Sequence, residues 1–335
     1  MPQRTPSAAP SSAPAAASGA YEKATFQTVW ALMSPNTWVA ALAPVPVGAA
    51  LAFGLTRAGY PTLFEVGLNT RSLGVFLLML VTATLMQSAA NALNDYADFK
   101  KGTDTAENSV DLADVPLVSS NVDPRTGLHV AIGCLVAAAF TGGLVVAIAG
   151  WTLLWIGLIG AVTVVLYSSG KTPLSFLPLG EVISGSVMGL LIPFATYYAL
   201  TGVLEWIVLL YALPTFLTIA MIMQTNNTCD IERDTAAGRR TAPMLLGAKL
   251  SAGVMAAAHL IAWLTVGAVV GTYFPWGLPL VGLGVFFAGS KIVDVLMVEY
   301  THLVRPESMK RAVSLTALNA AVYVAAIVIG AIARG

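Results

Sequence analysis

The chain has 335 residues, of which 57% are hydrophobic and only 10% charged, and its formal net charge at pH 7 is zero. Soluble domains carry about 25% charged residues, so this composition and a mean hydropathy of +0.77 exclude an ordinary soluble protein and indicate one that lies in the lipid bilayer. The neutral net charge gives no reason to expect a nucleic acid as partner, and nothing in the sequence predicts a protein partner. The two cysteines and three histidines lack the spacing of a disulfide framework or a zinc site.

The chain begins with a segment, residues 1–22, that is rich in Ala, Ser and Pro. Such a composition cannot bury enough apolar surface to fold, so this segment is expected to be a disordered tail. It lacks the continuous apolar core of a secretory signal. Residues 23–335 are expected to form one membrane domain.

Apolar runs bounded by charges, Gly and Pro fill that domain. A membrane-crossing helix needs about 20 apolar residues, and a backbone in lipid must satisfy its own polar groups. The runs lack the alternation that barrel strands show, so the sequence predicts an all-α polytopic membrane protein. Nine spans are expected, near residues 37–56, 72–94, 127–149, 151–169, 180–200, 204–227, 250–271, 276–298 and 313–333.

Lys and Arg residues are distributed unevenly between the two ends of these spans. Thirteen of the 17 lie in the tail or in the segments after the second, fourth, sixth and eighth spans, whereas only Arg57, Arg71 and Arg334 lie at the other ends. Cytoplasmic loops carry the excess of positive residues. A multi-pass protein of the inner (plasma) membrane is therefore expected, with its N-terminus and these even-numbered loops in the cytoplasm.

The acidic residues gather still more narrowly, since seven of the 17 follow the second span and three more follow the sixth. Each group has an Asn four residues before an Asp and a further Asp about one turn on. On a helix these positions share one face. The repeat suggests a duplicated four-helix unit whose two sites face each other. The residues are Asn91, Asp95 and Asp98 in the first group, and Asn226, Asp230 and Asp234 in the second.

Carboxylates this close together repel each other and resist desolvation, which a bound cation relieves. Oxygen ligands with access to water favour Mg²⁺, which is commonly shared with substrate phosphates. We therefore expect the four aspartates Asp95, Asp98, Asp230 and Asp234 to bind Mg²⁺ on a diphosphate. The side chains expected to bind the diphosphate itself are Asn91, Asn226, Lys100, Lys101, Arg239 and Arg240. The alternative is that these cations are solvated loop charges that only set the orientation.

The two acidic segments, residues 91–105 and 230–241, resemble the two signature motifs of the UbiA-like intramembrane prenyltransferases. Within that family they are most similar to the 1,4-dihydroxy-2-naphthoate polyprenyltransferases of menaquinone synthesis. The ending Gly102-Thr103-Asp104 of the first motif and the ending Gly238-Arg239-Arg240-Thr241 of the second favour that branch over the 4-hydroxybenzoate enzymes. The resemblance extends from about residue 30 to residue 333.

A third segment, residues 167–181, also fits the family. The resemblance implies that Tyr167 and Lys171 lie beside the diphosphate and the allylic carbon and act in catalysis. A tyrosine ring face can stabilise an allylic cation and a lysine can hold phosphate, although each alone would also fit an interfacial anchor. One departure is Ser34, which precedes Pro35 at the start of the first span, where family members usually carry Arg.

The resemblance implies transfer of a long-chain isoprenoid from its diphosphate to an aromatic acceptor. The expected acceptor is 1,4-dihydroxy-2-naphthoate, with loss of CO₂ and pyrophosphate to give a demethylmenaquinol. Related enzymes that act on 4-hydroxybenzoate, homogentisate or a tetrapyrrole are the first alternative. A secondary transporter is a more distant one, because its charges usually lie near the midplane of the membrane. A structural or assembly protein would not need two matching acidic faces.

Overall fold

The computed structural model describes residues 21–103 and 115–334. Of the expected disordered tail, only Tyr21 and Glu22 belong to this part, so the expectation stays a prediction. The backbone N–H of Glu22 donates to the carbonyl of Asn121 at 2.9 Å, which ties the start of the described chain to the segment that precedes the third long helix.

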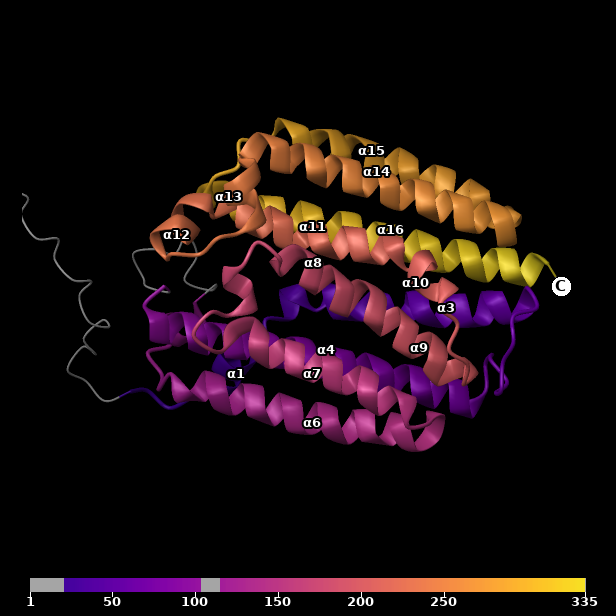
Figure 1. The fold of residues 1–335 in the computed structure, drawn as a ribbon, viewed down its shortest axis with the longest axis horizontal. Coiled ribbons are helices and arrows are strands. Elements are labelled where there is room, and N and C mark those ends of the chain that lie inside the picture. Colours follow the sequence, from indigo (N-terminus) through magenta and orange to yellow (C-terminus); the bar gives the residue numbers. More distant parts are fainter. Residues whose placement is uncertain (1–20, 104–114, 335) are drawn as a thin grey trace, which may run out of the picture.

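The described residues form helices joined by turns and loops, with one isolated bridge between Glu22 and Val122. Figure 1 shows their arrangement. In chain order the helices are α1 (Phe26–Met33), α2 (Val39–Leu42), α3 (Pro44–Arg57), α4 (Thr70–Lys101), α5 (Pro116–Ser119), α6 (Arg125–Ala149), α7 (Thr152–Ser168), α8 (Gly180–Ser184), the π-helix η4 (Gly185–Leu191), α9 (Ile192–Thr201), α10 (Ile207–Tyr211), α11 (Leu213–Cys229), α12 (Ile231–Ala236), α13 (Ala242–Leu246), α14 (Ala248–Tyr273), α15 (Leu278–Met297) and α16 (Arg305–Ala333). Short 3₁₀ turns lie at Pro35–Thr37, Leu174–Phe176, Pro275–Gly277 and His302–Val304.

The predicted all-helical membrane fold is confirmed, but the count of nine spans is not. Seven helical segments of the described chain are long and apolar enough to cross a bilayer. The expected fourth span is α7, which has only 17 residues. The expected sixth span is divided, because α10 ends at Tyr211 and α11, also of 17 residues, starts afresh with Pro214 in its first turn, where a proline has no N–H to continue a helix.

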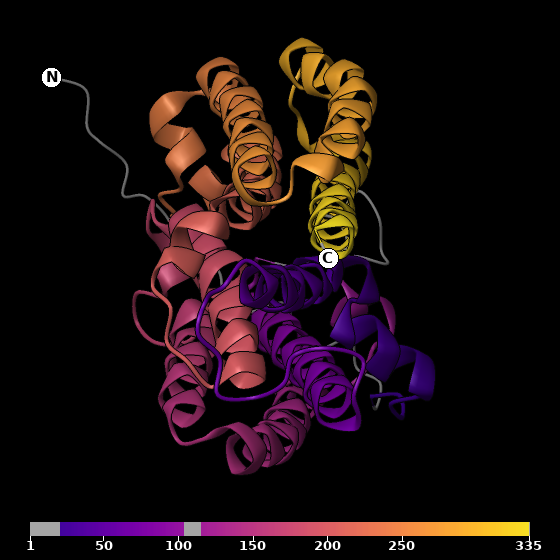
Figure 2. The same ribbon diagram turned by 90° about the vertical axis from the view of Figure 1, so that its right-hand side faces the viewer.

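The long helices run roughly parallel to one axis and pack into a bundle (Figures 1 and 2). Helix α4 packs along α6, and α11 packs against α14, α16 and η4. The centre holds fully buried side chains such as Leu51, Tyr197, Phe274 and Tyr323. Outward-facing positions carry many exposed apolar side chains, which suits a surface covered by lipid.

Close helix contact fixes the position of η4 against α11. An added Cβ on Gly189 would lie only 2.4 Å from the Cα of Phe216, so no larger residue fits there without movement of a backbone. This contact sets α8, which immediately precedes η4, beside the end of α11 where the second acidic segment begins.

The C-terminal ends of α4, α7, α11 and α15 all lie at one end of the bundle, at the left of Figure 1. Contacts between them agree with this: the backbone N–H of Arg240 donates to the carbonyl of Phe176 at 3.0 Å, and Asp230 contacts His302. The charge pattern assigned the loops after the second, fourth, sixth and eighth expected spans to one side of the membrane. The helix ends that lead into these loops do share one end of the molecule.

Candidate active site

The two acidic segments meet at this end of the bundle. The guanidinium of Arg239 lies 2.6 Å from Oδ1 of Asp98 on α4 and 3.5 Å from Oδ1 of Asp234 on α12. Both carboxylates are more than nine-tenths buried. Arg239 therefore connects residues that are 141 and five positions away from it in the chain, and it brings the two segments to one place.

The acidic residues of the first segment lie at the C-terminal end of α4. Helix α4 continues past the apolar span to Lys101 and ends at Gly102, which is in the left-handed conformation with φ 73°. Asp95 and Asp98 occupy its last two turns. The amide of Asn94 donates to Oδ2 of Asp98 at 3.0 Å, and the hydroxyl of Ser168 donates to Oδ1 of Asn94 at 3.2 Å, so the end of α7 holds the end of α4. Asp104 of the first motif lies outside the described residues.

In the second segment the helix is interrupted. Helix α11 ends at Cys229 and Asp230 has φ −107° and ψ 16°, after which α12 begins. Asp230 and Asp234 therefore do not lie on one continuous helix with Asn226, as the sequence periodicity predicted. The chain still turns helically at this point, because the N–H of Asp234 donates to the carbonyl of Asp230 at 2.8 Å.

Asp230 has two partners that sequence analysis did not identify. Nδ1 of His302 lies 2.5 Å from its Oδ1, and Nε of Arg305 lies 3.4 Å from its Oδ2. Arg305 also donates to Oδ1 of Asn226 at 2.9 Å. His302 lacks ligand spacing and Arg305 is one of many loop cations, so the sequence assigns neither residue to the site. No local pattern could find them, since 72 residues separate His302 from Asp230.

The surroundings of Asp234 change its acidity. Burial raises its pKa to about 6, although the Arg239 guanidinium acts in the opposite direction. Its Oδ2 is buried and accepts no hydrogen bond within the part of the chain that the structure describes. Burying a carboxylate oxygen that accepts no hydrogen bond costs free energy, and binding of a hard cation such as Mg²⁺ would offset that cost.

The described residues contain no group of three or more His, Cys, Asp and Glu side chains placed to hold a metal ion. Asp98 and Asp234 are held by Arg239 instead, and Asp230 by His302 and Arg305. The donors nevertheless fit Mg²⁺ in kind, because they are carboxylate oxygens at one end of the bundle and Oδ2 of Asp234 accepts no hydrogen bond from any described residue. The Mg²⁺ assignment for Asp95, Asp98, Asp230 and Asp234 stays a prediction.

The cations expected to bind diphosphate do not all lie at the meeting point. Lys101 lies with its Nζ 4.2 Å from the ring centroid of Phe176, and the guanidinium carbon of Arg239 lies 5.2 Å from the same centroid, so both flank one aromatic ring. Lys101 is nevertheless exposed, as are Lys100, Lys171 and Arg240, whereas Arg239 is half-buried.

The two predicted asparagines face different neighbours. Nδ2 of Asn91 donates to the carbonyl of Met33 at 3.0 Å and to Oγ1 of Thr37 at 2.8 Å, so this amide faces the turn after α1 and braces that turn against α4. Asn226 faces Arg305, as described above. The turn itself contains Ser34, at φ 47°, whose N–H and hydroxyl both donate to the carbonyl of Ala31.

Tyr167 lies beside the second segment. Its hydroxyl donates to Sδ of Met223 at 3.5 Å. Asp98, Asp234 and Arg239 lie near enough to act on this hydroxyl electrostatically. Tyr167 is thus placed among the acidic groups, whereas Lys171 is on the exposed loop that follows.

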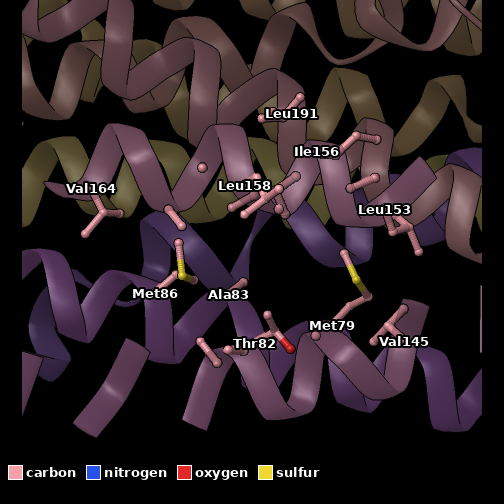
Figure 3. Close-up of a pocket in the computed structure, with 18 of the residues that line it drawn as sticks. Met79, Thr82, Ala83, Met86, Val145, Leu153, Ile156, Leu158, Val164 and Leu191 are labelled. Atoms are coloured by element: carbon pink, nitrogen blue, oxygen red, sulfur yellow. The ribbon is translucent and has the colours of Figure 1, made fainter. Parts of the chain in front are cut away.

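An apolar cavity of about 580 Å³ adjoins this end. It lies between α4, α6, α7 and η4, and Figure 3 shows Met86, Val164 and Leu191 among its lining residues. It begins at Gln87, one turn before Asn91 on α4, and reaches Trp151 near the opposite end of α7. The lining between Val165 and Trp151 spans 14 residues of helix, which corresponds to about 20 Å.

Comparison with known proteins agrees with this geometry. The model of the UbiA prenyltransferase family matches residues 41–311. The 1,4-dihydroxy-2-naphthoate octaprenyltransferase of Bacillus subtilis is 33% identical over 252 residues, 75% of this chain and 76% of the relative. The enzyme of the same description from Haemophilus influenzae is 29% identical, over 65% of this chain and 69% of the relative. The structure of a UbiA homolog from Archaeoglobus fulgidus bound to GPP and Mg²⁺ has a TM-score of 0.59 at 17% identity, covering 90% of this chain and 99% of that chain.

Proposed function

We propose, because this chain belongs to the UbiA prenyltransferase family, that it transfers a long-chain isoprenoid from its diphosphate to 1,4-dihydroxy-2-naphthoate. CO₂ and pyrophosphate would leave, and the product would be a demethylmenaquinol. The family membership confirms the resemblance inferred from the acidic segments. The naphthoate acceptor is supported by the names of the Bacillus and Haemophilus relatives.

One observation carries the proposal: Arg239 joins the acidic ends of α4 and α12, and a long apolar cavity begins at Gln87, 11 residues before Asp98 on α4. A prenyl diphosphate has the same division, with a highly charged head and an apolar tail. The head fits the polar end, where Lys101 and Arg239 can donate to phosphate oxygens. The tail fits the cavity, where its burial is favourable at about 25 cal/mol per Å² of apolar surface.

Mg²⁺ is part of the proposal and its ligands would be Asp95, Asp98, Asp230 and Asp234. When bound, the ion neutralises charge on the departing diphosphate. Arg239 and Lys101 supply hydrogen bonds to the same group, and His302 and Arg305 orient the Asp230 carboxylate. The structure bound to GPP and Mg²⁺ has this fold, which supports the assignment by fold alone.

Tyr167 is proposed to face the allylic carbon. Its position near Asp98, Asp234 and Arg239, one turn from the cavity-lining residue Val164, supports a role for its ring between head and tail. A ring face stabilises positive charge, and the apolar cavity wall keeps water from the developing allylic cation. The electron-rich acceptor ring then attacks that carbon.

The orientation in the membrane is also a proposal. The loops that carry most Lys and Arg residues share the end of the bundle at which the acidic segments meet. The positive-inside rule places that end in the cytoplasm, so we propose an inner-membrane enzyme whose site opens toward cytoplasmic acceptors. Reaction of a membrane-impermeant thiol reagent with a Lys249→Cys variant in sealed inverted vesicles, and its absence with an Arg57→Cys variant, would support this orientation.

The activity is tested with the purified protein in lipid nanodiscs, a radiolabelled polyprenyl diphosphate and Mg²⁺. A lipid-soluble product of the mass of the demethylmenaquinol, formed with 1,4-dihydroxy-2-naphthoate and lost on chelation, is the expected result. Product formed only with 4-hydroxybenzoate or homogentisate would reject the naphthoate acceptor. No aromatic product from any acceptor, together with solute uptake into proteoliposomes, would contradict a transferase.

A further inference from the structure

A buried carboxylate lies beside the proposed active site and has no role in the account above. Glu181, in the first turn of α8, is 5% exposed. Its Oε1 accepts a hydrogen bond of 2.8 Å from Nδ2 of Asn227 on α11. Its Oε2 is buried and accepts no hydrogen bond from any group in residues 21–103 and 115–334.

Two elements of the site, α7 and α11, flank this carboxylate. The neighbouring Gly180 is so close to Tyr167 that an added Cβ would lie 3.3 Å from the tyrosine hydroxyl. Among the acidic residues, Glu181 has the largest electrostatic effect on Tyr167, ahead of Asp234 and Asp98. Its partner Asn227 directly follows Asn226 of the second acidic segment. Glu181 therefore lies between the end of α7 and the end of α11, on the side of Tyr167.

A structural role alone does not explain a glutamate here. Glutamine would accept the same hydrogen bond from Asn227, and burying its neutral amide costs less than burying a carboxylate. A carboxylate kept in such a place can do what the amide cannot, which is to accept and return a proton.

We propose that Glu181 is the proton acceptor for the ring hydroxyl of the aromatic acceptor, an inference that rests on the proposed function. Its carboxylate takes the hydroxyl proton, and the electron pair of the broken O–H bond forms a ring carbonyl. The ring carbon attacks the first carbon of the donor, whose bond to the diphosphate oxygen breaks with both electrons leaving on the diphosphate. At an attacked carbon that carries a carboxylate, CO₂ then departs and leaves its bonding pair to the ring. The oxygen regains its proton from Glu181, so the residue ends as it began.

The first test is Glu181→Gln in nanodiscs, compared with Glu205→Gln in the loop before α10 at the other end of the bundle. Turnover at saturating naphthoate should fall about 100-fold or more, the range that a general base supplies. The Mg²⁺-dependent hydrolysis of the prenyl diphosphate to free prenyl alcohol, measured without acceptor, should persist. Glu205→Gln should match the parent protein in both assays. Unchanged turnover of Glu181→Gln would overturn the proposal.

A second measurement separates proton transfer from packing. Acceptors with ring fluorines have a more acidic hydroxyl and need a base less, so the defect of Glu181→Gln should shrink along such a series. A defect of constant size would overturn the proposal. If Glu181→Gln does not fold, Glu181→Ala takes its place with added formate, which should restore turnover; no restoration would count against the base. A parent protein that prenylates no aromatic acceptor would instead reject the proposed function itself.

Discussion

Removal of the Arg239 side chain should have opposite effects on Mg²⁺ binding and on turnover. Arg239 is the described cation that contacts both Asp98 and Asp234. At 2.6 Å and an effective dielectric constant of about 20, its attraction to Asp98 alone is about 6 kcal/mol before desolvation is subtracted. Loss of one partner from a buried pair costs about 3 to 5 kcal/mol. The side chains of this pair are 15% and 10% exposed, so the lower figure applies.

In Arg239→Ala, Mg²⁺ no longer competes with the guanidinium for these carboxylates. A difference of about 3 kcal/mol corresponds to about a hundredfold lower Kd for Mg²⁺ in the absence of diphosphate. Turnover should nevertheless fall, because the diphosphate loses a donor. Without Mg²⁺ the variant should unfold at lower temperature than the parent protein, and Mg²⁺ should restore more of its stability.

Isothermal titration of Mg²⁺ into nanodisc-embedded protein measures the Kd, and thermal unfolding with and without a chelator measures the stability. The matched control is the Arg240→Ala variant, because Arg240 is adjacent to Arg239 but exposed. This variant should have the Mg²⁺ Kd and the thermal stability of the parent protein. Equal Mg²⁺ affinities in the Arg239→Ala and Arg240→Ala variants would refute the reasoning that Arg239 and the metal share the same carboxylates.

Three further outcomes are expected. The pKa of Asp234 is raised to about 6, so protons compete with Mg²⁺ below that pH and the Kd for Mg²⁺ should rise about tenfold as the pH falls from 7 to 5. In the Asp234→Asn variant this tenfold rise should vanish. A rise that persists in the variant would contradict the assignment of Asp234 as a Mg²⁺ ligand. Gly160 lines the cavity, so Gly160→Leu should reduce turnover of long donors more than that of a geranyl donor, whereas Gly133→Leu, outside the cavity lining, should not discriminate between them. Gly189→Ala places a Cβ 2.4 Å from the Cα of Phe216, so it should lower the free energy of unfolding by about 1 to 3 kcal/mol, as thermal unfolding would measure. An unchanged unfolding temperature would show that η4 can move away from α11 without a cost in stability.

The sequence by itself determined the class of this protein and the two segments that matter most. Apolar length is a local property, so it indicated a helical membrane domain without reference to any contact. The acidic segments were found in the same way, because Asp95 and Asp98 are one helical turn apart. The count of nine spans was not confirmed: α7 has only 17 residues, and the start of α11 at Leu213, with Pro214 in its first turn, divides one apolar run into two helices.

Only the tertiary structure decided which side chains meet at the site. Asp98 is held by Arg239, and Asp230 by His302 from a loop 72 residues away. Asn91 turned toward Met33 instead of the aspartates, and Glu181 gained its place through Asn227. The physical reason is that helical periodicity fixes which residues share a face, whereas the partner of that face is fixed by the packing of helices that are distant in the chain.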